Sequence, residues 1–340
     1  RPTTRGVAMN PATGTSGYAS CTSLLDPSPW PQNGNVVQQA GNLATAQARA
    51  FGAYLNDTIT IIPEVKLVGG IRQDVYYAQI GNSINMVNTA GNTTLGYAER
   101  TDTYTSVRGG PIFQPDKVQT YYASYSTSFN PSLEQLVSTT GTSSPLPPQT
   151  NEAFEVGAKY DFLGGNLNFS TAAFQITQNN ARSRNTDGTF SATGQVQVKG
   201  IRAGISGRIT DEWQIWAGYT YLDARIVNGI GAGTTGMVPN NTPRDTAVLW
   251  STYTFAKTYE IGGGMTYMGQ RYANDTNTTV VPEFYRFDAT AAFKQPTYDV
   301  RLNVFNLLNT TNFESVIPSD GGRAVPGTGL TAMLSYVHHM

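Results

Sequence analysis

Five side chains in polar stretches of this sequence have the chemistry to bind an anion. Arg182 and Arg184 share one such stretch, Arg271 is adjacent to Tyr272, and Arg323 lies in the last long polar stretch. A guanidinium offers forked donors that stay charged at any relevant pH, and a tyrosine ring adds stacking or cation–π contact. We therefore predict these five residues as ligand contacts. The alternative for each, an exposed and solvated loop residue, is the commoner situation.

Catalytic and metal chemistry finds little support in the remaining residues. The only histidines, His338 and His339, are adjacent near the end of the chain, which leaves none for a zinc site or a Ser-His-Asp arrangement. Asp275 has too few neighbouring carboxylates for a calcium site. The single cysteine, Cys21, is either an idle thiol or pairs with a cysteine that precedes residue 1. We expect no enzymatic activity, no resident cofactor and no metal.

The composition favours a β-rich protein with an unusual surface. Charged residues make up 13% of the 340, below the roughly 25% of soluble domains, whereas glycine (35) and tyrosine (19) are abundant. The net charge is −1 and no Lys/Arg run occurs, which argues against a nucleic-acid partner. No apolar stretch reaches the about 18 residues of a membrane-spanning helix.

The elements that must position the five residues are strands with one apolar and one polar face. From Phe284 to Phe293, aromatic and aliphatic side chains alternate with Arg286, Asp288 and Thr290. Successive strand residues point to opposite faces, so this segment must separate an apolar medium from water. Because the pattern recurs with short turns on one side and long loops on the other, we predict an all-β, antiparallel transmembrane β-barrel. About thirteen strands are expected, at 46–60, 65–75, 103–113, 118–129, 153–162, 167–178, 195–209, 213–224, 246–255, 260–272, 282–293, 298–306 and 329–336.

This rhythm also predicts an orientation. The expected periplasmic turns are 62–64, 115–117, 163–166, 210–212, 256–259 and 295–297. The expected extracellular loops are 81–101, 130–150, 179–194, 225–245, 273–281 and 307–328. Residues 1–45 are expected to be an extracellular loop region, and 46–340 the barrel. A β-bulge is expected near Ala172-Ala173, where the alternation slips. Charges on the polar face are interpreted as a wall network, with contact to a solute or an inner domain as the alternative.

A count of thirteen strands implies a larger barrel. Bacterial single-chain barrels have even strand numbers, and an unpaired strand edge is unfavourable in lipid. The chain begins at Arg1 without a methionine or an apolar signal segment. We therefore expect it to be the C-terminal part of a longer protein.

Seven stretches, in order, resemble motifs of the TonB-dependent outer-membrane receptors, most closely the siderophore branch. They are Tyr54–Asp57 with Leu67–Asp74, Tyr122–Pro131, Glu155–Tyr160, Phe174–Arg182, Asn241–Arg244, Arg301–Asn309 and Val325–Gly329. The likeness covers roughly residues 46–340. Two departures are Gly329-Leu330, where the family commonly has Pro-Arg, and an end at Met340 rather than at an aromatic residue.

The resemblance implies a 22-stranded barrel around a plug domain, in the outer membrane of a Gram-negative bacterium. Neither a plug nor a TonB box is recognisable in this sequence. The implied function is TonB-dependent uptake of a ferric siderophore, with catecholate types most similar, by a monomer surrounded by outer-membrane lipid. TonB and the inner-membrane energising complex would act through the missing plug. Alternatives are a receptor for cobalamin, haem or a glycan, or a porin or adhesin barrel that does not use TonB.

Overall fold

The computed structural model describes residues 7–9, 16–18, 44–87, 93–131, 147–184, 190–229, 233–317 and 323–339. Within these ranges a 13-stranded antiparallel sheet accounts for most residues, in the order β19-β16-β15-β12-β11-β10-β9-β8-β7-β6-β5-β4-β3. Its strands are β3 (Ala44–Ile62), β4 (Val65–Val87), β5 (Thr93–Phe113), β6 (Gln119–Asn130), β7 (Gln149–Phe162), β8 (Leu167–Arg184), β9 (Phe190–Arg208), β10 (Trp213–Asn228), β11 (Asp245–Phe255), β12 (Tyr259–Met268), β15 (Phe284–Lys294), β16 (Tyr298–Phe305) and β19 (Thr331–His338). The expected count of thirteen strands is confirmed.

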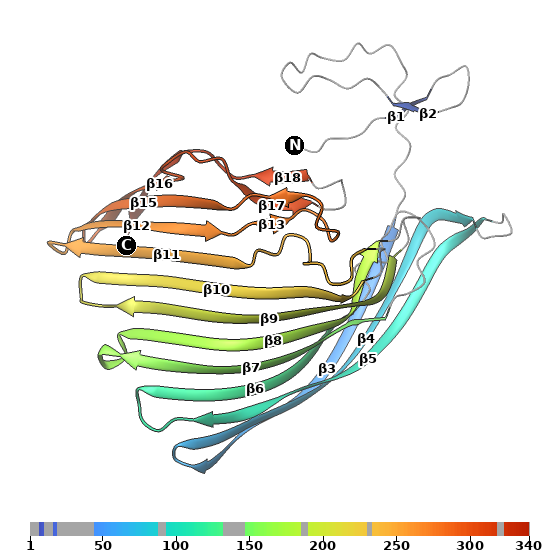
Figure 1. Ribbon diagram of the computed structural model, residues 1–340, viewed down its shortest axis with the longest axis horizontal. Helices are drawn as coiled ribbons and strands as arrows, with labels where there is room; N and C mark the ends of the chain where they lie inside the picture. The colour runs from blue at the N-terminus through green and yellow to red at the C-terminus, as the bar shows by residue number, and fades with distance from the viewer. Residues whose placement is uncertain are drawn as a thin grey trace.

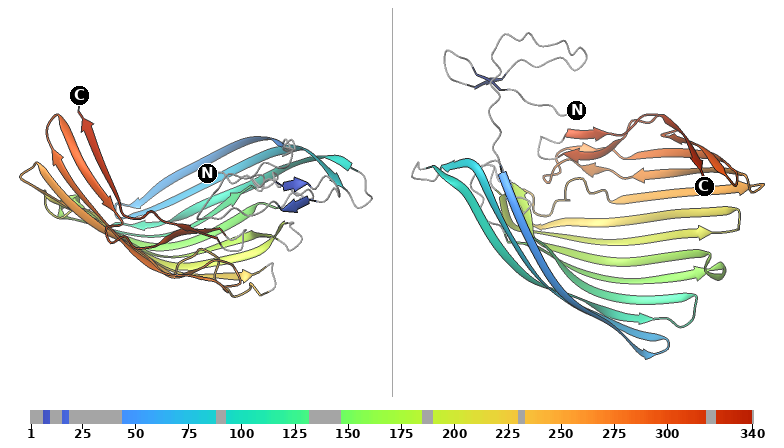
Figure 2. Two further views of the ribbon diagram at one scale, coloured as in Figure 1. Left: turned by 90° about the horizontal axis from the view of Figure 1, so that it is seen from above. Right: turned by 180° about the vertical axis from the view of Figure 1, so that it is seen from behind.

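Each strand of this sheet pairs with its neighbour along the chain, and the sheet curves between its edge strands β3 and β19 (Figures 1 and 2). Three two-stranded sheets accompany it in the described part of the chain. They are formed by β1 (Val7–Met9) with β2 (Ser16–Tyr18), β13 (Arg271–Tyr272) with β14 (Val280–Val281), and β17 (Phe313–Ile317) with β18 (Arg323–Pro326). No helix in the described ranges has the length and apolar character to cross a membrane.

The short turns lie along one edge of the sheet, and the hairpins β13–β14 and β17–β18 lie along the opposite edge (Figure 1). In the β5–β6 turn, the Asp116 carboxylate accepts hydrogen bonds from the Val118 N–H (2.7 Å) and the Gln119 N–H (2.8 Å). These bonds, the Val118 bond first, lower the pKa of Asp116. The support that Asp116 gives to this turn is therefore present at neutral pH and is lost as the pH falls through that lowered pKa.

Three expectations for the connections need correction. Strand β4 runs to Val87 and β5 starts at Thr93, so most of the expected loop 81–101 is paired strand. Likewise β8 runs to Arg184 and β9 starts at Phe190, inside the expected loop 179–194. The sequence of these extensions is rich in Gly, Asn, Ser and Thr and lacks the regular alternation that predicts a strand. The bulge expected near Ala172-Ala173 is absent from this continuous pairing, and the register instead shifts between Asn179 and Ser183.

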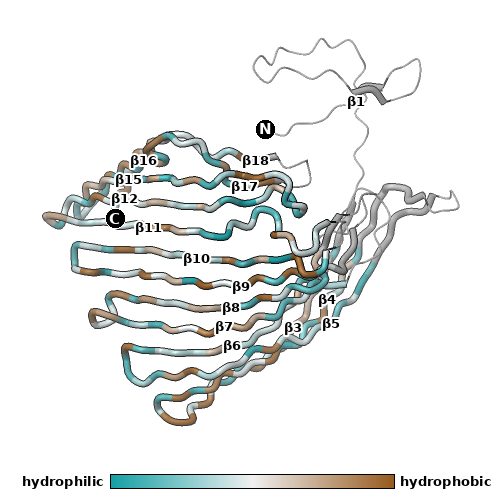
Figure 3. The backbone as a smooth tube through the Cα atoms, in the orientation of Figure 1, coloured by the Kyte–Doolittle hydropathy of each residue, from teal (hydrophilic) through white to brown (hydrophobic). Residues whose placement is uncertain are grey.

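The two faces of the sheet differ as the alternation predicts, and hydrophobic and hydrophilic residues follow one another along the coloured parts of the sheet strands in Figure 3. The apolar face exposes large side chains such as Phe51 and Leu55, each 71% accessible. The polar face carries ion pairs, among them Arg72–Asp74 (2.6 Å) and Arg202–Glu155 (2.8 Å). The predicted wall network is therefore present. A closed barrel places this polar face inside and the apolar face against lipid.

Candidate functional site

Three connections at the edge opposite the short turns pack into one body, which we call the loop unit. It comprises residues 233–244, 269–283, 306–317 and 323–330. Its small apolar core consists of Ala273, Val281 and Val316, all buried, with Phe313 packed against them. The core joins the β13–β14 hairpin to β17, which pairs with β18. Apolar burial thus holds together segments that are far apart in the chain.

Hydrogen bonds fix the first connection of the loop unit to the second. The Asn277 side chain donates to the Val238 carbonyl (2.7 Å) and accepts from the Val238 N–H (2.9 Å). The Asp275 carboxylate accepts from both the backbone N–H (2.8 Å) and the side-chain amide (2.7 Å) of Asn240. Side chains here complete the backbone hydrogen bonds that a regular strand pairing would supply.

Arg271 links all three connections of the loop unit. It is 1% exposed, its Nε donates to Asn241 Oδ1 (2.9 Å), and its Nη2 donates to the Phe313 carbonyl. Burial lowers the pKa of Arg271. Its Nη1 has no hydrogen-bond partner among the described residues. Packing between the connections therefore encloses Arg271 and commits two of its guanidinium nitrogens to contacts within the loop unit, while its ligand contact stays a prediction.

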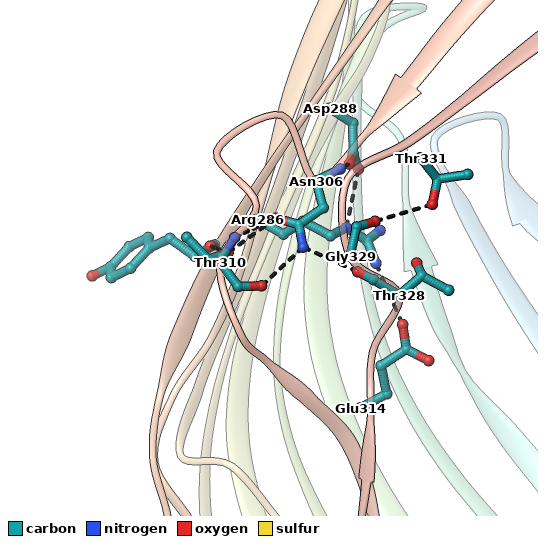
Figure 4. A network of polar contacts seen from close by, with 9 residues as sticks. Arg286, Asp288, Asn306, Thr310, Glu314, Thr328, Gly329 and Thr331 are labelled. Atoms are coloured by element: carbon teal, nitrogen blue, oxygen red, sulfur yellow. Dashed lines mark hydrogen bonds and ion pairs between the residues drawn. The ribbon is translucent and has the colours of Figure 1, made fainter. Parts of the chain in front are cut away.

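Asn306 attaches the last connection to the sheet. Its side chain is fully buried, and its Nδ2 donates to the carbonyls of Thr310 (2.8 Å) and Thr328 (3.0 Å). Its Oδ1 accepts from the Thr310 N–H (2.9 Å), and its own N–H donates to Asp288 Oδ1 (2.8 Å). Figure 4 shows these contacts converging on Asn306.

A second set of contacts extends this attachment to strand β17. The Arg286 guanidinium lies 3.2 Å from Asp288 Oδ2 and 3.6 Å from Glu314 Oε1 (Figure 4). Strand β15 thereby holds the segment 306–317 at two points. Asp288 binds Asn306, and Arg286 binds Glu314. The loop unit is consequently tied to the sheet wall and not only to itself.

The structure brings together three of the five predicted site residues. Arg271 and Tyr272 form β13, and Arg323 begins β18 of the same loop unit. Tyr272 is half-buried, and its carbonyl accepts the Asn241 N–H (2.8 Å). Arg182 and Arg184 belong to the separate β8–β9 hairpin. The side chains of Arg182, Arg184 and Arg323 lie outside the described residues, so their ligand contacts stay predictions.

Sequence reasoning missed the asparagines that build the loop unit. Asn241, Asn277, Asn306 and Asn309 all have positive φ, between 50° and 55°. Asparagine is the non-glycine residue that adopts this left-handed conformation most readily. Isolated asparagines in a polar stretch could have been recognised as such positions. Among the described residues no group of three or more His, Cys, Asp and Glu could hold a metal ion.

We expect Arg271→Met to loosen the loop unit while leaving the sheet intact. The change removes donors to Asn241 Oδ1 and the Phe313 carbonyl, and hydrogen bonds to charged groups contribute about 1.5–3 kcal/mol each. Because the buried charge disappears as well, we expect a net local loss of about 2 kcal/mol. Amide exchange at Asn241 should then accelerate roughly tenfold to thirtyfold. The control is Arg244→Met, since the Arg244 side chain is exposed and its described contacts are a hydrogen bond to the Tyr221 hydroxyl and a cation–π contact with the Tyr221 ring. Equal exchange in both variants would contradict this role for Arg271.

The chain is similar in sequence to known proteins. A family model described as "TonB dependent receptor-like, beta-barrel" matches residues 10–307. The chain is 30% identical to the "Probable TonB-dependent receptor BfrD" of Bordetella pertussis, over 96% of this chain and 46% of that protein. It is also 30% identical to the "Probable TonB-dependent siderophore receptor PiuA" of Acinetobacter baumannii, over 93% and 44%. The chain therefore spans about half the length of these relatives.

Solved structures show the same architecture. The crystal structure of the siderophore receptor PiuA from Acinetobacter baumannii superposes with a TM-score of 0.75 at 28% identity, over 86% of this chain and 43% of that one. The closed form of the ferric-catecholate import receptor Fiu from Escherichia coli K12 gives a TM-score of 0.75 at 25% identity, over 87% and 45%. The 13-stranded sheet is thus similar to about half of each receptor.

Proposed function

This chain belongs to the TonB-dependent receptor family of Gram-negative outer-membrane proteins, as part of its β-barrel, and from this premise we propose that the complete receptor takes up a ferric siderophore. The relatives that support the proposal are named as siderophore receptors, including PiuA and the catecholate receptor Fiu. A catecholate chelate is anionic and aromatic, which suits a surface that presents arginine and tyrosine. We therefore favour a catecholate as the ligand.

The observation that carries the proposal is the preassembled loop unit on the side opposite the short turns. If the short turns face the periplasm, this unit meets a ligand arriving from outside. Loops that are already ordered lose less conformational entropy on binding than free loops do. We propose that Tyr272 and Arg323 contact the ligand from this unit, and Arg182 and Arg184 from the β8–β9 hairpin. Arg271 acts by holding the unit together.

The family is one of receptors, and we propose that no reaction is catalysed. Transport would be driven by TonB and the inner-membrane energising complex through a lumen domain, because passage of a large chelate against a gradient requires work. In this proposal the chelated iron is cargo and not a cofactor.

Growth on defined iron chelates tests this function. The complete receptor is expressed in a Gram-negative strain that lacks its own siderophore receptors, under iron limitation. We expect growth with a ferric catecholate, and loss of that growth when TonB is deleted. Tyr272→Ala and Arg323→Ala should weaken binding of the chelate by about 1–3 kcal/mol each, the range for a charged or buried hydrogen bond. Growth that persists without TonB would indicate a passive pore. Failure to grow on every iron chelate tested would indicate another cargo.

A further inference from the structure

An apolar hollow interrupts the polar face of the sheet. Trp216 of β10 and Trp250 of β11 are directly paired across the two strands, and the row continues to Gly264 and Asp288. Together with Val248 and Thr266 these residues line a hollow of about 320 Å³. Trp216 is 54% exposed, whereas tryptophan on the opposite face would meet lipid. On a water-facing wall, the exposed Trp216 ring is an apolar surface available for contact.

The local geometry keeps this hollow open and apolar. A Cβ at position 264 would overlap the Trp250 ring, so the glycine lets that ring lie close against the neighbouring strand. The adjacent row on one side is Gln214, Thr252, Gly262 and Thr290, which are polar or small. The two tryptophans therefore stand out from the wall around them.

The charges at the hollow argue against an anionic chelate as its occupant. The lining contains no arginine or lysine, and Arg286 in the next row of the wall is already paired with Asp288 and Glu314. Its one carboxylate, Asp288, already accepts hydrogen bonds from the Asn306 N–H (2.8 Å) and Arg286 Nε (3.2 Å). The surface left for an occupant is aromatic and aliphatic, which suits a hydrophobic side chain.

We propose that Trp216 and Trp250 form a seat for a hydrophobic side chain of the domain that fills the barrel lumen. The polar face lies inside a closed barrel, and 22-stranded outer-membrane transporters have a plugged lumen. The relatives are about twice as long as this chain, which leaves sequence for such a domain. Paired aromatic anchors in a hollow are typical of the residues that dominate binding at protein interfaces. The inference rests on the barrel architecture and not on which ligand is carried.

Photocrosslinking in the complete receptor tests the seat directly. A photoreactive benzoyl-phenylalanine at position 216 keeps the aromatic bulk, and the same residue at position 213 is the control. Trp213 is also in β10 but lies on the apolar face, where its Nε1 donates to Ser251 Oγ (2.8 Å). We expect position 216, and not 213, to crosslink to the lumen domain. A crosslink from 216 only to added ferric chelate, or to neither, would overturn the proposal.

Proteolysis of the lumen domain from the periplasmic side gives an independent measurement. Trp216→Ala with Trp250→Ala should accelerate cleavage at least about tenfold, because truncating anchor residues weakens an interface strongly. Barrel folding, followed by heat-modifiable gel mobility, should be unchanged, and so should chelate binding to the outer surface. If the double variant folds and its lumen domain is cleaved at the rate of the Trp213→Ala control, the seat does not exist.

Discussion

Replacing Asn306 by Ala should destabilise the folded protein by about 2–4 kcal/mol and release the last connection from the sheet. The substitution leaves the Thr310 carbonyl, the Thr328 carbonyl and the Thr310 N–H without their side-chain partner. Each unsatisfied buried group costs about 1–3 kcal/mol, and the exposed position of Thr328 lowers the sum. Alanine at the positive φ of residue 306 (51°) adds roughly 1 kcal/mol of backbone strain.

The matched control for this change is Asn309→Ala. Asn309 has nearly the same backbone conformation, with φ of 50°, but accepts only one described hydrogen bond, from the Leu330 N–H (2.9 Å). We expect a loss of about 1–2 kcal/mol from the lost bond and the strain together. The measurements are the urea midpoint of the refolded receptor and protease cleavage between residues 307 and 330 on intact cells. Equal stability of the two variants would contradict the role of Asn306 as the attachment point.

The sequence pattern was sufficient to predict the sheet because one face must meet lipid. In β15, Tyr285 and Phe287 alternate with Arg286 and Asp288, and β15 pairs in continuous register with β12 and β16. The pattern fails in strand extensions such as that of β4, where Gln79 to Val87 remain paired with β5 although the sequence shows no regular alternation of apolar and polar residues.

The site was less predictable, because its contacts join residues far apart in the chain. Arg271 has the residue type expected of a ligand contact, but its burial depends on Asn241 and Phe313, which approach it only in the folded protein. In contrast, the stretch from Asn306 to Asn309 resembled a family motif, although the resemblance gave no physical role. The structure shows this physical role. Asn306 and Asn309 both adopt the left-handed backbone conformation, and their side chains hydrogen-bond the returning segment at Thr328 and Leu330.

The other large effect is expected on the wall of the barrel, at Glu260. Its side chain is 8% exposed and lies between Lys294 Nζ (2.6 Å) and Arg301 Nη1 (2.8 Å), which ties β12 to β15 and β16. Glu260→Ala leaves two cations together on the wall without their shared counter-charge. Breaking a fully buried pair costs about 3–5 kcal/mol, and we expect about 2–3 kcal/mol here because both cations are about one third exposed.

A double-mutant cycle separates this ionic contribution from simple loss of packing. Lys294→Met keeps the aliphatic part of the side chain and removes one of the two cations, so it should recover part of the stability lost in Glu260→Ala. Asp74→Ala is the matched control on the same wall, where the partner Arg72 is half-exposed, and its effect should be clearly smaller. The readout is the urea midpoint at fixed ionic strength, because salt screens exposed charges.

Glu260→Ala should leave chelate binding to the outer surface unchanged, since Glu260 lies at the short-turn end of β12, remote from the loop unit. Additive effects in the cycle would contradict the ionic coupling of Glu260 and Lys294. A loss of chelate affinity in Glu260→Ala would contradict the separation of the wall from the loop unit.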